Sequence, residues 1–261
     1  MMCLTTDPVT VKCEESSDKL PVVAVIIPTC LAAEGSRVGL NAILNALNES
    51  PISHETIIVL NDPKRFPIAE VLWFVDEHPI FVCVPRRLGY VGACNLGYAA
   101  AGQLAPRAAY VCVLNDDVLA QGEFLAPMVD ALDADPKLGI VGPSVHHVGR
   151  DGLWGKGDEK YKYVEGWCFM ARQTAVWEAA ACDGGVLFDP EFSPGYCEDM
   201  DLAISMQQIC SSPSWNWTIG QVDLPLTHLR SVTFGDNREP FWSRNRRRLV
   251  IKWGLNRDGE T

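Results

Sequence analysis

Two groups of acidic residues in this chain have the types and spacing to do chemistry. The first, Asn115-Asp116-Asp117, directly follows the apolar run from Tyr110 to Leu114. Adjacent carboxylates at the end of a buried strand are costly unless solvent, a cation or a phosphate-bound metal neutralises them. Asn and Asp are also common turn formers, so this group indicates either an acidic turn or a metal site.

The second group, Glu198, Asp199 and Asp201, lies at the start of the helix-like segment "CEDMDLAISMQQI". Acids at a helix N-terminus can simply stabilise the helix through its dipole. Crowded carboxylates also raise one another's proton affinity, which a general base requires. The residues alone leave both interpretations open.

The elements that must position these groups are visible as short apolar runs that alternate with helical patterns. We expect strands at 22–29, 55–62, 79–86, 109–116 and 139–145, and helices at 37–50, 68–78, 91–104, 122–136 and 197–209. Strands that alternate with helices predict an α/β fold with a mostly parallel sheet covered on both faces. Residues past about 150 are less regular and hold most of the tryptophans.

The residue types at the ends of the expected strands all suit one kind of ligand. In open α/β sheets, ligands bind outside the carboxyl ends of the strands. Here those ends are Pro28-Thr29, Asn61-Asp62, Arg86-Arg87 and Asn115 to Asp117, all polar or charged except for the proline. This predicts a nucleotide or phosphate ligand on one rim of the sheet.

Absent motifs narrow the class of protein. The first strand is not followed by G-x-G-x-x-G, and no G-x-x-x-x-G-K-[ST] occurs, which disfavours dinucleotide-binding and P-loop proteins. The chain also lacks G-x-S-x-G, the motif of serine α/β-hydrolases, and H-E-x-x-H, the motif of many zinc proteases. These absences disfavour both enzyme classes.

The net charge of −11 argues against nucleic-acid binding, which usually needs a basic face. The local exception is a basic cluster near the C-terminus. It consists of Arg244, Arg246, Arg247, Arg248 and Lys252. Such a cluster is either a solvated helix face or a contact with an anion, including peripheral contact with a membrane.

Cysteine usage and hydropathy indicate the compartment. The ten cysteines include no Cys-x-x-Cys pair, which favours reduced thiols. Apolar runs such as Val22 to Ile27 are far shorter than the roughly 20 residues that span a bilayer. The N-terminus has no cationic start followed by an apolar stretch, so residues 1–20 are expected to form a flexible extension of a cytoplasmic protein.

Nine segments occur in an order that resembles family 2 glycosyltransferases with the GT-A (nucleotide-diphospho-sugar transferase) fold, in particular the rhamnosyltransferase-like branch. They are "VAVIIPT", "VLND", "RRLGYVGACNLGYAAA", "YVCVLNDDV", "GIVGP", "EGWCFMARQTAVWE", "YCEDMDL", "THLRSVTFG" and "IKWG". The resemblance covers residues 21–254 and implies one GT-A domain. Residues 21–145 would bind the nucleotide sugar, 146–254 would form the acceptor and catalytic half, and 255–261 would be a tail.

The resemblance implies a divalent metal, Mn²⁺ or Mg²⁺, that bridges the diphosphate of the donor. Asp117 matches the second acid of the family's D-x-D element, and Asn115 stands where the first acid would be. His228 resembles a further metal ligand, and imidazole suits Mn²⁺ better than Mg²⁺; the alternative is a structural histidine. The positions implied to bind the nucleotide sugar are Pro28, Thr29, Asp62, Arg87, Gly89, Gly92, Asn95, Asn115, Asp116 and Trp167.

The family's Glu-Asp pair falls at Glu198 and Asp199. The resemblance implies that Asp199 deprotonates an acceptor hydroxyl, on a glycan or another molecule, while Glu198 and Asp201 orient the acceptor or the sugar. The implied reaction is an inverting transfer from a UDP- or dTDP-linked sugar. One alternative is a nucleotidyltransferase, which would usually carry a Gly-rich basic loop where this chain has "PTCLAAEGSR". Another is a non-catalytic nucleotide-sugar-binding module, which the intact acidic pair disfavours.

Overall fold

The computed structural model describes residues 9–11, 22–30, 34–62, 79–155, 159–180, 184–208, 216–229 and 239–256. The helix expected at 68–78 and most of the extension expected at 1–20 lie outside these residues. Within that extension, Val9–Val11 form a strand that pairs with the main sheet, where the sequence predicted a flexible segment.

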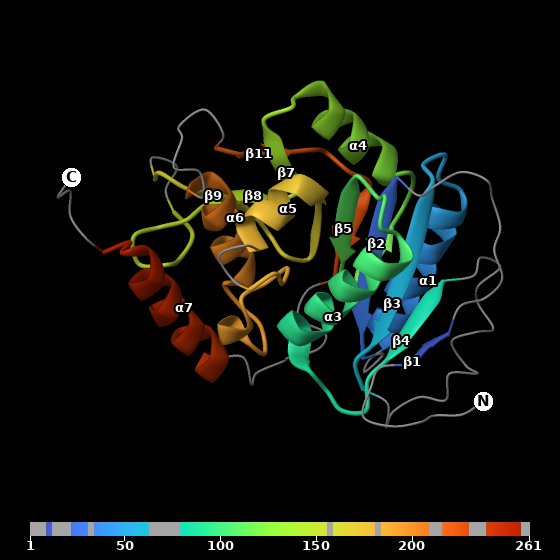
Figure 1. Ribbon diagram of the computed structural model, residues 1–261, viewed down its shortest axis with the longest axis horizontal. Coiled ribbons are helices and arrows are strands. Elements are labelled where there is room, and N and C mark those ends of the chain that lie inside the picture. Colours follow the sequence, from blue (N-terminus) through green and yellow to red (C-terminus); the bar gives the residue numbers. More distant parts are fainter. Residues whose placement is uncertain are drawn as a thin grey trace.

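The described residues form an eight-stranded sheet with the order β1-β4-β3-β2-β5-β10-β7-β11 (Figure 1). Its strands are β1 (Val9–Val11), β2 (Val23–Thr29), β3 (His54–Leu60), β4 (Ile80–Cys83), β5 (Tyr110–Leu114), β7 (Leu138–Gly142), β10 (Cys168–Arg172) and β11 (Thr218–Gln221). The pairs β2–β3, β3–β4, β2–β5 and β7–β11 are parallel. Strand β10 runs antiparallel between β5 and β7, and β1 is antiparallel at the edge. The mostly parallel sheet expected from the sequence is therefore confirmed.

Two small antiparallel ribbons lie beside this sheet. The first pairs β6 (Val118–Ala120) with β12 (Leu226–His228), and the second pairs β8 (Val145–His147) with β9 (Lys162–Val164). Strand β6 directly follows Asp117, β12 ends at His228, and β9 directly precedes Glu165.

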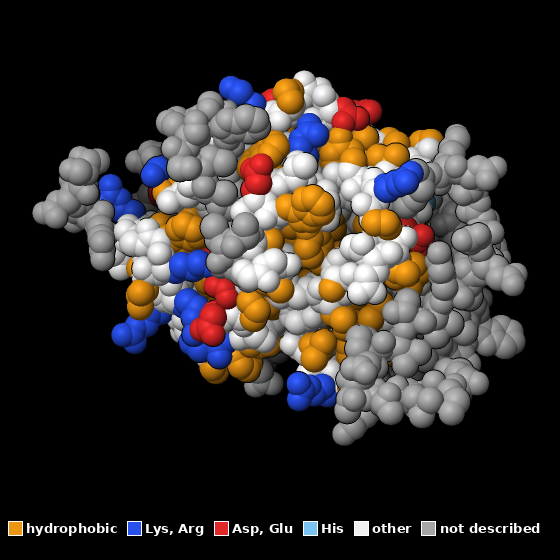
Figure 2. Space-filling view, in the orientation of Figure 1, with side chains coloured by type: hydrophobic (Ala, Val, Ile, Leu, Met, Phe, Trp, Pro, Cys, Tyr) orange, Lys and Arg blue, Asp and Glu red, His pale blue; other side chains and the backbone are white. Residues whose placement is uncertain are grey.

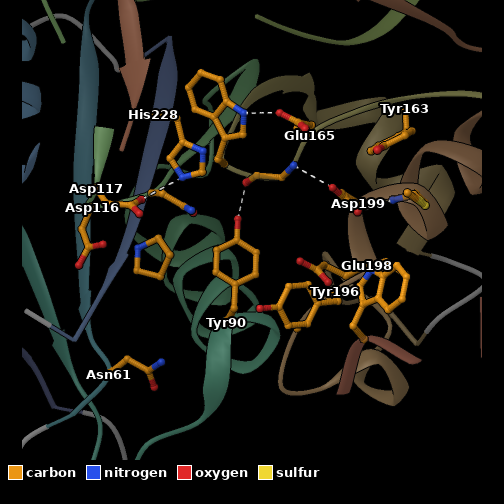
Figure 3. A pocket seen from close by; sticks show the side chains of 18 of the residues that line it. Asn61, Tyr90, Asp116, Asp117, Tyr163, Glu165, Tyr196, Glu198, Asp199 and His228 are labelled. Carbon is orange, nitrogen blue, oxygen red and sulfur yellow. Dashed lines mark hydrogen bonds and ion pairs between the residues drawn. The ribbon is translucent and has the colours of Figure 1, made fainter. Parts of the chain in front are cut away.

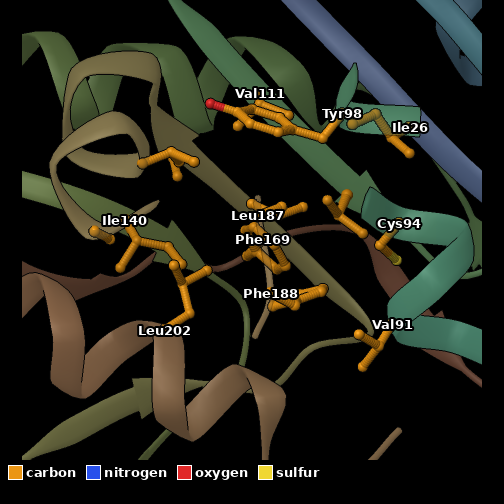
Figure 4. Close-up of a cluster of buried hydrophobic side chains, with 14 of the residues drawn as sticks. Ile26, Val91, Cys94, Tyr98, Val111, Ile140, Phe169, Leu187, Phe188 and Leu202 are labelled. Carbon is orange, nitrogen blue, oxygen red and sulfur yellow. The ribbon is translucent and has the colours of Figure 1, made fainter. Parts of the chain in front are cut away.

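Helices cover both faces of the sheet. They are α1 (Glu34–Asn48), α3 (Gly89–Leu104), α4 (Leu125–Ala134), α5 (Gln173–Ala180), α6 (Glu198–Gln208) and α7 (Glu239–Trp253), with a 3₁₀ turn at Pro190–Phe192. Helices α1 and α4 share one apolar core with alternate residues of β2, while α3, α5 and α6 share the other (Figures 1 and 4). Because successive strand residues point to opposite faces, Ile26 faces α3 and Ile27 faces α1. None of the described helices is long and apolar enough to cross a membrane.

The small residues of α3 let it lie close to the sheet. A Cβ atom on Gly97 would clash with Ile26 and would also lie 3.1 Å from Val59. Gly97 therefore permits α3 to pack closely on β2. Near the other end of the chain, Leu255 donates a backbone hydrogen bond to Val250 (3.1 Å) and packs on the core.

Candidate active site

A cavity of about 800 Å³ lies at the carboxyl ends of the central strands. Thr29, Asn115, Asp116 and Asp117 line it from the sheet side. Residues at the start of α6 line the opposite side, so the two acidic groups of the sequence face each other across one cavity (Figure 3).

On the sheet side, Asp117 and His228 lie next to each other. Their Oδ1 and Nε2 atoms are 3.2 Å apart. The ribbon of β6 and β12 explains this contact, because it pairs His228 with Val118, the residue after Asp117. The Asp117 carbonyl also accepts a hydrogen bond from the Leu229 N–H (2.9 Å). Residues 111 positions apart in the sequence are thus fixed at one point of the cavity.

Asp116 has a different environment from Asp117. Its carboxylate is buried and accepts a hydrogen bond from the Thr29 hydroxyl (2.5 Å). Burial raises the pKa of Asp116 to about 6. The backbone of this turn lies directly on α1, where a Cβ atom on Gly39 would clash with the Asp116 carbonyl. Gly39 therefore sets the position of the acidic turn, a role that its place in a helical pattern did not reveal.

Asn115 contributes a buried oxygen without a partner. Its backbone N–H donates to the Trp167 carbonyl (2.8 Å), but its side-chain Oδ1 has no hydrogen-bond partner among the described residues. Buried polar atoms are normally paired, so this oxygen is suited to a ligand.

The sheet side offers a sparse set of metal ligands. Among the described residues, no three His, Cys, Asp or Glu side chains are grouped closely enough to hold a metal by themselves. The carboxylate of Asp117, the imidazole of His228 and the free amide oxygen of Asn115 are nevertheless the hard and borderline donors that Mn²⁺ and Mg²⁺ accept. These residues fit a cation whose remaining ligands are phosphate oxygens.

On the opposite side, Asp199 is held by backbone amides. Its Oδ2 accepts a hydrogen bond from the Gly166 N–H (2.9 Å) and its Oδ1 accepts one from the Met200 N–H (2.8 Å). Burial raises the pKa of Asp199 to about 6, although these hydrogen bonds oppose the shift. Asp199 is therefore largely ionised at neutral pH but can still take up a proton.

Glu198 is more deeply buried than Asp199. Burial, together with the neighbouring Asp199, raises its pKa well above the usual range. Its Oε2 has no hydrogen-bond partner among the described residues. Tyr196 and Cys197, just before it, have φ angles of 79° and 68°, in the left-handed region that non-glycine residues seldom occupy. Such backbone strain is common at functional sites.

Asp201 does not join this acidic pair in the cavity. Its buried carboxylate accepts hydrogen bonds from Lys252 (2.9 Å) and from the indole N–H of Trp253 (2.7 Å). The expectation that Asp201 orients the acceptor is corrected here, because its side chain anchors α7 instead.

The other positions implied by the resemblance divide into two sets. Pro28, Thr29, Asn115, Asp116 and Trp167 line the cavity. Asp62, Arg87, Gly89, Gly92 and Asn95 do not.

Structural contacts account for three members of the second set. The side chain of Asn95 exchanges two 2.8 Å hydrogen bonds with the backbone of Phe188. Gly89 has a φ of 75° and lies against Pro194, where a Cβ atom would come within 2.6 Å. A Cβ atom on Gly92 would lie 2.8 Å from Leu88, so this glycine permits close packing within the same segment.

Several lining residues were not singled out from the sequence. They are Tyr90, Trp154, Tyr163, Glu165, Tyr196 and Trp242. Asn61 accepts a hydrogen bond from the Leu88 N–H (2.7 Å) and donates one to the Gly89 carbonyl (3.0 Å). Glu165 accepts one from the Trp167 indole (2.7 Å) and lies 3.3 Å from His146. Asn61 lies in the segment "VLND" and Glu165 begins the segment "EGWCFMARQTAVWE", so the sequence carried a signal for both positions.

Four of the five residues in the basic cluster bind the protein itself. Arg244 donates to the Ser193 carbonyl, and Arg248 forms an ion pair with Glu191. The other two contacts are the hydrogen bond from Arg246 to the Asp151 carbonyl (2.6 Å) and that from Lys252 to Asp201. Figure 2 shows basic side chains gathered over α7 with acidic ones beside them. Arg247 is exposed and has no such contact with the described residues.

The mostly parallel sheet with helices on both faces is consistent with an α/β GT-A fold. Residues 24–185 match the model of the family described as Glycosyl transferase family 2, and the chain belongs to this family. No curated protein matches the chain.

A solved structure similar in fold is the mannosyltransferase PcManGT from Pyrobaculum calidifontis in complex with GDP-Man and Mn²⁺. The TM-score is 0.53 at 17% sequence identity, and the match covers 94% of this chain. The chain spans 66% of the length of that structure.

Proposed function

We propose that this protein is an inverting glycosyltransferase that moves a sugar from a nucleoside-diphosphate donor to an acceptor hydroxyl. Family membership supports a glycosyltransferase that uses a nucleotide sugar. The single observation that carries the mechanism is that Asp117 with His228 and Asp199 face one cavity from opposite sides. A UDP- or dTDP-linked sugar is the proposed donor, and a glycan is the proposed acceptor.

The sheet side is the proposed site of the donor diphosphate. Asp117, His228 and Asn115 would hold Mn²⁺ or Mg²⁺ there, and the cation would neutralise charge on the departing nucleoside diphosphate. The described residues that line the cavity include acids but no Lys or Arg. Because a diphosphate would otherwise meet only like charges from Asp116 and Asp117, the lining supports a metal-dependent donor site.

Asp199 is the proposed general base. It takes the proton of the acceptor hydroxyl, whose oxygen bonds to the anomeric carbon while the bond from that carbon to the diphosphate oxygen breaks. Attack opposite the leaving group inverts the anomeric centre. The amides of Gly166 and Met200 fix the carboxylate, and its raised pKa of about 6 suits a base that works near neutral pH.

A thermal-shift panel of nucleoside diphosphates, with and without Mn²⁺, tests the donor site. A specific ligand stabilises the folded chain by mass action, so one base should raise the Tm and Mn²⁺ should increase the shift. No shift with any nucleoside diphosphate would contradict the proposal. With the best base, NMR of the transfer product should show an inverted anomeric centre.

Two outcomes favour the alternative functions. Release of pyrophosphate from a nucleoside triphosphate and a sugar phosphate would identify a nucleotidyltransferase. Tight binding of a nucleotide sugar without transfer to any hydroxyl would identify a non-catalytic binding module.

A further inference from the structure

We propose that Trp154 is the platform of an acceptor subsite and that this subsite takes an uncharged saccharide. The proposal rests on the proposed function, because it names the acceptor class of the same cavity. Trp154 lines the cavity, yet its side chain is 60% exposed. An exposed indole at the wall of a cavity offers a flat apolar face on which a ligand can stack.

Trp154 is held rigidly in the described structure. Its ring stacks on His146, with centroids 4.8 Å apart and planes 3° apart. Its backbone forms a β-bridge with Val148, and the next residue, Gly155, donates to the His147 carbonyl (2.8 Å). A ring that is fixed before binding loses little conformational entropy when a ligand stacks on it.

The start of α7 completes the wall beside Trp154. Trp242 and Glu239 line the same cavity, and the guanidinium of Arg246 lies 5.5 Å from the Trp242 ring centre. The 151–155 loop is fixed to this helix, because Arg246 donates to the Asp151 carbonyl (2.6 Å). Two indoles from segments far apart in the sequence therefore flank one end of the cavity.

The charges at this end decide the class of acceptor. Glu165, Asp199 and Glu239 line the cavity, and the described lining residues include no Lys or Arg. Carboxylates repel a phosphate or uronate but accept hydrogen bonds from hydroxyl groups. The basic cluster on α7 does not offset them, since four of its five members bind the protein itself. A neutral sugar ring offers an apolar face to the indole and hydroxyls to the carboxylates.

Saturation-transfer NMR on the full chain, with its best nucleoside diphosphate and diamagnetic Mg²⁺ in excess, tests the subsite without requiring turnover. The probes are the methyl glycosides of glucose, mannose and rhamnose, with methyl glucuronide as the matched anion. We expect at least one neutral glycoside to receive saturation and the glucuronide to receive less. Trp154→Ala should weaken that binding about tenfold, and Trp154→Phe should restore most of it.

Trp177→Ala is the matched control, because Trp177 is 64% exposed but lies outside this cavity. It should leave glycoside binding unchanged, and the Kd of the nucleoside diphosphate should be the same in all variants. Three results would each overturn the inference: no saturation of any neutral glycoside by the wild-type chain, equal binding by Trp154→Ala, or preference for the glucuronide. Loss of nucleoside diphosphate binding in the wild type would instead overturn the proposed function.

Discussion

Trp167 lies face to face with His228, with ring centroids 4.9 Å apart and planes 14° apart. The indole N–H of Trp167 is fixed by Glu165 (2.7 Å), and His228 in turn meets Asp117 (3.2 Å). Because Glu165 also meets His146, a continuous series of ring stacks and polar contacts joins the proposed acceptor wall to the proposed metal site.

Removing the Trp167 ring should therefore disturb the metal site, although an indole is no metal ligand. Trp167→Ala leaves the imidazole of His228 without its stacking partner, so Mn²⁺-dependent binding of nucleoside diphosphate should weaken several-fold. Trp167→Phe keeps an aromatic face and should lose less. Calorimetry with and without Mn²⁺ measures both variants, and equal affinities across the three proteins would exclude this coupling.

Asp117→Ala should abolish the increase in nucleoside diphosphate affinity that Mn²⁺ produces, because it removes the only described carboxylate that contacts His228. His228→Ala should reduce the same increase and leave metal-free binding unchanged. Asp130→Ala, on an exposed position of α4, is the control. A Mn²⁺ titration that is identical in Asp117→Ala and wild type would remove Asp117 from the metal site.

Asp199→Asn should bind donor normally and transfer about 10²- to 10⁴-fold more slowly, the usual contribution of a general base. Because burial raises the pKa of Asp199 to about 6, wild-type kcat/KM should rise with pH and level off above about pH 6. The variant should lose this pH dependence. Glu198→Gln should slow transfer less, since Glu198 transfers no proton in the proposed mechanism. If Glu198→Gln is instead the slower variant, Glu198 and not Asp199 is the general base.

The same raised pKa predicts how stability depends on pH. Below the usual carboxyl pKa, Asp199 is neutral in both the folded and the unfolded chain. Between about pH 4 and 6 the folded chain retains a proton that the unfolded chain has lost, so its contribution to stability falls as pH rises. Asp199→Asn should thus gain stability over wild type at pH 8, by about 3 kcal/mol, and most of the gain should be lost near pH 4. Urea unfolding at both pH values measures this, and an equal difference at the two would contradict it.

The sequence predicted the parallel part of the fold because strands that are buried on both faces appear in it as continuous apolar runs. All seven residues of β2 are buried, which requires a continuous apolar run. Strand β10 was not among the expected strands, and its direction could not have been predicted either, since Cys168–Arg172 carries only the short apolar pattern of a buried strand. Strand order and direction arise from long-range pairing that no local pattern records.

For the site, helix geometry explains the error at Asp201. Residues 199 and 201 are two positions apart, about 200° around an α-helix, so they point to opposite sides. Asp199 consequently faces the cavity and Asp201 faces α7. The role of Trp154 could not be predicted from the sequence for another reason. Its position depends on His146 and on an irregular loop, and neither has a periodic sequence pattern.

Asn245 holds the loop that leads into the acidic pair, and its amide gives the sharpest test of that loop. The side chain is completely buried within the arginine-rich α7. Its Nδ2 donates to the carbonyls of Phe192 (2.5 Å), Gly195 (2.8 Å) and Tyr196 (3.3 Å). Its Oδ1 accepts from Arg244 (3.0 Å).

Asn245→Asp keeps the shape of the side chain but replaces the donating amide with an acceptor that faces these three carbonyls. We expect a loss of about 3 kcal/mol or more in unfolding free energy, as for other buried groups left unpaired, and a fall in kcat. Asn245→Ala should cost less than Asn245→Asp, because it removes the amide without adding a buried charge. Arg247→Gln, two positions along the helix and exposed, should change neither quantity. Urea unfolding and kcat on the four proteins measure this order, and an Asn245→Asp variant as stable as wild type would show that α7 does not hold the loop.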